Sequence, residues 1–102
     1  MLELTQEEMD FLMDLAQFAF LPLARRADDM VPVYLEDDRY TKEEYSLILQ
    51  VLEQKRLISL DYDKPLRNFY AAQYAAYPVK GSVALTERGQ KVVEMLEIEG
   101  IS

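Results

Sequence analysis

The stretch from Thr41 to Glu97 constrains the fold most strongly, because it predicts a helix, a strand, an aromatic-rich excursion, a second strand and a last helix in that order. Thr41 and Glu44 have the spacing of a capping box, which marks the start of the first of these helices. Alternating apolar residues at 57–62 predict the first strand, and residues 82–85 predict the second. The order predicts a mainly helical α+β domain with a small β-hairpin.

The first forty residues predict one clear helix and one segment of unclear structure. A capping box at Thr5 and Glu8 precedes apolar residues that recur at helical spacing over residues 9–23. Pro22 is expected to kink or end this helix, because proline cannot donate a backbone hydrogen bond. We expect a short helix over residues 23–29, followed by a short strand or a buried turn.

Composition argues against an enzyme. The 102 residues make one domain, residues 1–102, and they include no Cys and no His. The commonest general base, the thiolate nucleophile and the soft metal ligands are therefore missing. The three glycines form neither a phosphate loop nor a dinucleotide motif. The acidic clusters at 28–29 and 36–38 lack the spacing of a calcium loop and are expected to be solvated. We expect no cofactor and no metal site.

The charge is distributed unevenly along the chain. The formal net charge is −8, which disfavours general attraction to nucleic acids or anionic membranes. Residues 1–63 carry 15 acidic and 6 basic side chains, whereas residues 64–91 carry one acidic and 5 basic side chains. The second segment is thus locally positive, and salt screening lets such a segment contact a polyanion within an acidic protein.

A cytoplasmic location without membrane contact is expected. No apolar run approaches the roughly 20 residues that span a bilayer. The N-terminal residues are acidic, unlike those of a secretory signal peptide. The absence of Cys also fits a reducing compartment.

Two short motifs resemble winged helix-turn-helix regulators of the MarR-like and PadR-like families. The first is Glu-Gln-Lys-Arg-Leu-Ile at residues 53–58, which resembles their junction between a charged helix end and a strand. The second is Leu-Thr-Glu-Arg-Gly at residues 85–89, which resembles the junction after their wing. The resemblance covers Thr41 to Glu97, and those families usually have Gly where this chain has Arg56. It implies a dimer formed by the terminal helices, with the helix before the wing in the major groove of DNA.

The resemblance identifies candidate DNA-binding residues on that helix, on the wing and at the start of the last helix. Gln side chains can read base edges and Lys or Arg side chains can hold phosphates. The acidic residues of the same helix oppose both roles, so an ordinary solvated face is the alternative interpretation. The candidate residues are Lys42, Gln50, Gln54, Lys64, Arg67, Lys80, Arg88 and Lys91.

Aromatic residues alternate with basic residues in and around the excursion between the two predicted strands, residues 66–78. They are expected either to stack against a partner or a ligand, or to seal the wing onto the core while their hydroxyls face water. The excursion itself is expected to be a short helix or an irregular loop inserted in the wing. The candidate partner or ligand residues are Phe69, Tyr70, Tyr74 and Tyr77.

The first and last helices are apolar over a wide arc, which is typical of helices that pack in a dimer. The candidate interface residues are Phe11, Leu15, Phe18, Met95 and Ile98. Three functions remain open at this point. The first is a homodimeric transcription regulator that binds double-stranded DNA through a basic wing. The second is a winged helix that has lost DNA binding and binds another protein, and the third is a sensor of a small ligand.

Overall fold

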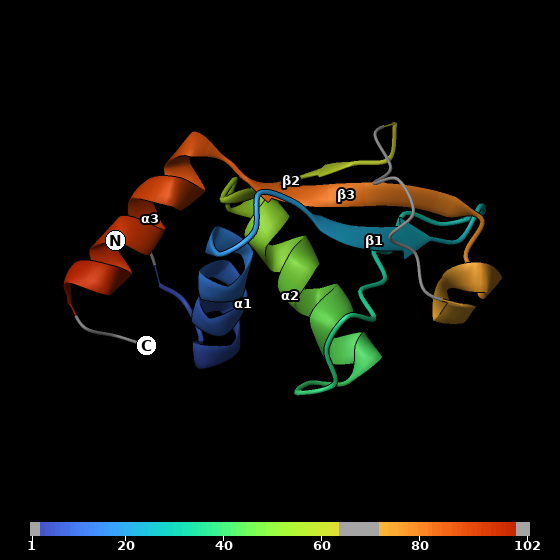
Figure 1. Cartoon of the computed structure of the whole chain (residues 1–102), viewed down its shortest axis with the longest axis horizontal. Coiled ribbons are helices and arrows are strands. Elements are labelled where there is room, and N and C mark those ends of the chain that lie inside the picture. The colour runs from blue at the N-terminus through green and yellow to red at the C-terminus, as the bar shows by residue number, and fades with distance from the viewer. Residues whose placement is uncertain (1–2, 64–71, 100–102) are drawn as a thin grey trace.

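The computed structural model describes residues 3–63 and 72–99, which form three α-helices, one short 3-10 helix and a three-stranded antiparallel sheet (Figure 1). The predicted α+β class is therefore confirmed. In chain order the elements are α1 (Gln6–Ala16), β1 (Leu21–Arg25), α2 (Lys42–Gln54), β2 (Ile58–Asp61), η1 (Ala72–Ala76), β3 (Val79–Leu85) and α3 (Glu87–Ile98).

The sheet has the order β1-β3-β2, so the strand that returns last in the sequence lies at the centre. Leu21 pairs with Val83 on one side, and Ile58 pairs with Leu85 on the other. Figure 1 shows α1 and α2 side by side beneath the sheet, α3 at one end of the molecule and η1 near the opposite end. The hairpin of β2 and β3 thus follows α2 as predicted.

Both capping boxes are confirmed. The Thr5 hydroxyl accepts a hydrogen bond from the Glu8 amide at 3.2 Å, and the Glu8 carboxylate accepts one from the Thr5 amide at 3.4 Å. Thr41 and Glu44 make the same exchange at 3.1 and 2.8 Å. Each box satisfies two amides that have no partner within the helix, which explains why the two helix starts could be predicted from local sequence.

The expected continuation of the first helix and the short helix over residues 23–29 are wrong. The first helix ends at Ala16, and residues 21–25 form β1. Pro22 is compatible with this strand, because β1 lies at the edge of the sheet, where a missing amide costs little. Leu21 and Leu23 are buried there. Burial and pairing with β3 therefore override the helical spacing of these residues.

Residues 26–41 contain no helix. The segment instead returns past β1, where Ala24 and Val33 exchange two backbone hydrogen bonds of 3.0 and 2.7 Å in an isolated antiparallel bridge. This outcome agrees with the expected short strand or buried turn. It also means that α2 has no partner helix across a short turn, as a helix-turn-helix would have.

The core lies between the sheet and the helices. Tyr45, Ile48, Leu49 and Leu52 are buried along α2, as its apolar spacing predicts. The core residues with no exposed side chain include Leu12, Leu15, Leu23, Leu49, Leu52, Leu57 and Val83. An edge-to-face cluster of Phe11, Tyr34 and Tyr45 closes one side of this core, with ring centroids between 5.1 and 6.2 Å apart.

The two motifs that resemble winged-helix junctions meet in space. Arg56 follows the last turn of α2 in the left-handed conformation, with φ of 64°, at the position where Gly was expected. The Thr86 hydroxyl donates to the Arg56 carbonyl at 2.7 Å, and the Thr86 amide donates to the Leu57 carbonyl at 3.1 Å. A side chain at Gly89 would overlap that Leu57 carbonyl oxygen. The end of α2 and the start of α3 are thereby fixed against each other.

Candidate functional site

The outer face of α2, the candidate DNA-reading face, is mixed in character. Gln50 and Gln54 are exposed, as is Glu43. The Lys42 ammonium lies 3.3 Å from the Tyr77 hydroxyl and 3.9 Å from the Glu43 carboxylate. Leu47, at the centre of this face, is 63% exposed beside a shallow pocket of about 310 Å³. An acidic and apolar surface of this kind is poorly matched to phosphates.

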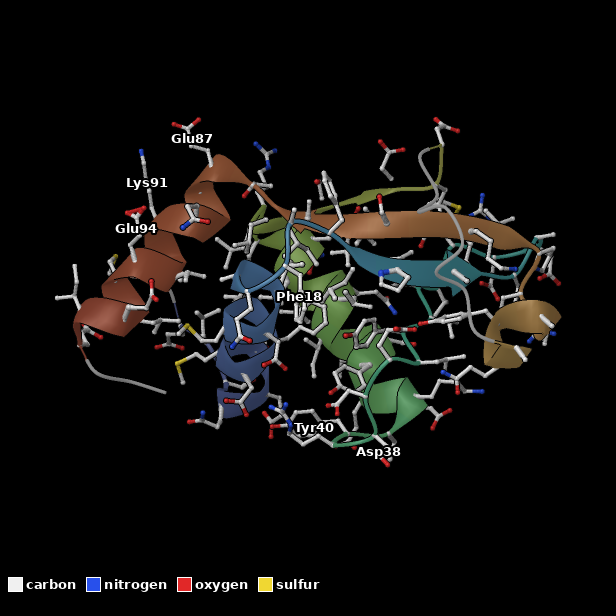
Figure 2. The ribbon with its side chains drawn as sticks, in the orientation of Figure 1. Phe18, Asp38, Tyr40, Glu87, Lys91 and Glu94 are labelled. Atoms are coloured by element: carbon white, nitrogen blue, oxygen red, sulfur yellow. The ribbon has the colours of Figure 1, made fainter. Side chains whose placement is uncertain are left out.

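The described basic residues of the positive segment do not gather into one patch. Lys80 lies at the start of β3, whereas Arg88 and Lys91 lie on α3 beyond its end, so roughly 20 Å of strand separates the two groups. The Lys80 ammonium donates to the Tyr77 carbonyl. Figure 2 shows Lys91 on the outer side of α3 with Glu87 and Glu94 close to it. Lys64 and Arg67 lie outside the described residues.

The aromatic residues of the excursion have different environments. Tyr74 is completely buried, and its hydroxyl accepts a hydrogen bond from the Leu35 amide at 2.9 Å. It seals η1 onto the segment before α2 and is not available to a partner, so this residue was wrongly placed on a partner surface. Tyr77 is half-buried. Phe69 and Tyr70 lie outside the described residues.

The candidate dimer residues also divide into two groups. Phe11 and Leu15 are buried in the core of the single chain, so they are corrected to core residues. Phe18, Met95 and Ile98 are 55%, 58% and 84% exposed. The wide apolar arc of the first helix is thus satisfied within the chain, because α1 packs against α2, α3 and β3.

A hollow lies between the end of α1 and the segment before α2. This groove, which we call the Phe18–Phe20 groove, has a volume of about 810 Å³. Phe18 and Phe20 line it and are 55% and 54% exposed. Figure 2 shows Phe18 near the end of α1, where the chain turns toward β1. The remaining lining residues are Asp14, Gln17, Ala19, Leu21, Pro22, Tyr34, Glu36, Asp37 and Arg39.

A charged network forms one wall of the Phe18–Phe20 groove. The Arg39 guanidinium lies 3.1 Å from the Asp14 carboxylate, 3.5 Å from that of Asp37 and 3.9 Å from that of Asp10. Asp37 also accepts a hydrogen bond from the Tyr45 hydroxyl. This hydrogen bond, together with Arg39, lowers the pKa of the Asp37 carboxyl below its ordinary value of 3.8. Asp37 therefore stays ionised at neutral pH.

The acidic cluster at 36–38 was expected to be solvated loop. The structure instead uses Asp37 to hold this loop against α1 and α2 through Arg39 and Tyr45, while Asp38 is exposed. Local sequence carries no signal for the Phe18–Phe20 groove, because its walls come from separate parts of the chain. The tyrosines behind the wall are packed tightly, and burial raises the pKa of Tyr34 and Tyr45 above the ordinary value.

Among residues 3–63 and 72–99, no group of three or more carboxylates is arranged to hold a metal ion. Within the same ranges, no helix has the length and apolar character needed to cross a bilayer.

Comparisons of this chain with models of protein families, with curated proteins and with solved structures gave no match.

Proposed function

We propose that this chain is a non-enzymatic, cytoplasmic winged-helix domain that binds a protein partner rather than DNA. The winged-helix part of the proposal is supported by the β2–β3 hairpin after α2 and by the contact between the Arg56–Leu57 and Thr86–Gly89 junctions. The domain differs from a helix-turn-helix because no helix precedes α2 within residues 26–41.

The observation that carries the protein-binding proposal is the pair of exposed rings in the Phe18–Phe20 groove. Large aromatic side chains that are half exposed in a concave site are typical anchors of protein interfaces. Here they stand beside a wall that the Arg39 network holds in place. The surface is thus ordered before a partner arrives, which reduces the entropy lost on binding.

The same proposal accounts for the features that oppose DNA binding. The outer face of α2 presents Glu43 and Leu47, whereas a DNA recognition helix needs basic and amide side chains there. The described basic residues of the positive segment are split between Lys80 at the start of β3 and Arg88 and Lys91 on α3. With a net charge of −8, the whole molecule repels a polyanion at low salt.

Site-specific photo-cross-linking tests the proposal. A photoreactive phenylalanine analogue at Phe18 or Phe20 is expected to cross-link one protein in the cells that make this chain, and the same analogue at exposed Gln90 is not. The captured protein is then identified and purified. In reconstitution, Phe18→Ser should weaken its binding at least tenfold, as expected for an aromatic anchor worth about 1.4 kcal/mol or more. Equal affinity of wild type and Phe18→Ser would contradict the proposal.

Homodimerisation through the last helix is part of the same proposal. Met95 and Ile98 are the exposed apolar residues of α3. The photoreactive analogue at Ile98 is expected to give a product of twice the chain's mass with the purified protein alone. A monomeric product at every concentration would remove the dimer from the proposal.

DNA binding is the second candidate, and the exposed positions of Lys42, Gln50 and Gln54 on α2 favour it. In that case the double variant Arg67→Ala, Lys80→Ala should abolish binding if the wing carries the contact. An unchanged affinity would remove the wing from this second candidate.

A further inference from the structure

We infer that the Phe18–Phe20 groove takes a basic amphipathic segment of its protein partner. An aromatic or branched aliphatic side chain of that segment packs between the two phenylalanines, and a neighbouring Arg or Lys faces the acidic wall. This inference rests on the proposed protein-binding function and adds the chemistry of the partner to it.

The charge of the wall is the first argument. Asp14, Glu36 and Asp37 line the Phe18–Phe20 groove, and Arg39 is the one basic side chain in its lining among the described residues. Arg39 is already shared among three carboxylates between 3.1 and 3.9 Å away. Since one guanidinium faces several carboxylates, the wall keeps a net negative charge that a cationic side chain of the partner can offset.

The direction of α1 is a second, independent argument. This helix ends at Ala16, and the residues around its end, Asp14, Gln17 and Phe18, line the Phe18–Phe20 groove. The C-terminal end of a helix carries a partial negative charge from its unpaired carbonyls. No basic residue lies in the last turn of α1 to neutralise it. The helix end therefore also favours a cation in the groove.

The apolar floor excludes a purely ionic occupant. Phe18 and Phe20 line the groove and are more than half exposed, while Leu21 and Pro22 beside them in its lining are buried. A hydrophobic side chain is needed to gain from covering these groups. A purely apolar segment would, in turn, desolvate the carboxylates without compensating them. Only a segment with both kinds of side chain satisfies the two parts of the groove.

Selection from a random library of short peptides tests the inference on the full chain. Selected peptides are expected to place Arg or Lys next to an aromatic or branched aliphatic residue, and their affinity should fall with increasing salt. The Phe18→Ser variant should not bind the selected peptides. The Glu36→Lys variant should bind them about tenfold more weakly. The matched control is Asp38→Lys, which makes the same charge change outside the groove lining, at a site away from Phe18 in Figure 2. It should have little effect.

The outcomes separate the two proposals. One outcome would overturn this inference and leave the proposed function standing. In it the selected peptides are acidic or uncharged, Phe18→Ser abolishes their binding, and Glu36→Lys leaves their affinity unchanged. Self-association of the chain that Phe18→Ser abolishes would also overturn it, because the occupant would then be a second copy. If no selected peptide depends on Phe18, both the inference and the docking role of the Phe18–Phe20 groove fail.

Discussion

Arg56 and Gly89 show how single residues define the junction on which the fold depends. Leu57 donates to the Leu52 carbonyl at 3.0 Å and Arg56 donates to the Glu53 carbonyl at 2.9 Å, which is the Schellman pattern at the end of α2. That pattern needs a left-handed residue, and this chain supplies an arginine. Gly89 lets α3 approach the Leu57 carbonyl. The two motifs thus fix the end of α2 close to the start of α3.

Arg56→Gly is expected to stabilise the protein. The left-handed conformation destabilises a residue with a Cβ by roughly 1–2 kcal/mol, and glycine removes this strain. Part of the gain, roughly 0.5–1 kcal/mol, is offset because glycine has more conformational entropy in the unfolded chain. The free energy of unfolding should therefore rise by about 1 kcal/mol, measured by urea denaturation with an unchanged m value. The control Gln54→Gly, in the last turn of α2, should lower it. A decrease for Arg56→Gly would show that this arginine makes a compensating contact.

Among the elements, local signals were sufficient for the starts of the first two helices and insufficient for the end of α1 and for β1. The capping boxes at Thr5 and Thr41 need only four consecutive residues, so both helix starts could be predicted. The pairing of Leu21 with Val83 joins residues far apart in the sequence, and no local pattern reports it. The Phe18–Phe20 groove has the same origin, because it forms only when the loop that carries Arg39 closes over α1.

The packing of η1 decides between the two interpretations of the aromatic residues at Tyr74. Its ring is buried against the chain rather than offered to a partner, and its hydroxyl accepts from the Leu35 amide instead of facing water. Gln73 adds a hydrogen bond from its side-chain amide to the Leu35 carbonyl at 2.6 Å. Alternation of bases and aromatic residues therefore marked a contact within the chain at this position.

Buried tyrosines make the fold sensitive to alkaline pH. Burial raises the pKa of Tyr34, Tyr45 and Tyr74 above the ordinary value of 10.0, and it raises the pKa of Tyr62 to about 12. The folded state then binds these protons more tightly than the unfolded state, so the stabilisation is complete below pH 10.0 and is lost as pH rises above it.

Spectrophotometric titration measures this effect directly. Part of the tyrosine absorbance change should be delayed beyond pH 10.0 and should appear together with loss of helical circular dichroism. Ionisation of all 7 tyrosines near their ordinary pKa with the fold intact would contradict the burial described for these residues.

For the whole molecule, the distribution of charge fits the proposed protein-binding function better than DNA binding. The molecule extends over 40 × 23 × 21 Å, and Lys80 at the start of β3 is separated along that strand from Arg88 and Lys91 on α3. The Phe18–Phe20 groove has an acidic wall instead. The uneven charge along the sequence was visible from the start, but its division in space depends on the direction of β3. The predicted positive patch therefore could not be tested without the fold.

Fluorescence anisotropy of a random-sequence DNA duplex, titrated with the purified chain at low and at moderate salt, tests whether this domain binds DNA. We predict no binding at either salt concentration, because the outer face of α2 is acidic and apolar and the net charge is −8. Binding at low salt that weakens steeply as salt is added would demonstrate phosphate contacts. That result would contradict the proposal that this domain binds a protein rather than DNA, and it would favour DNA as the partner.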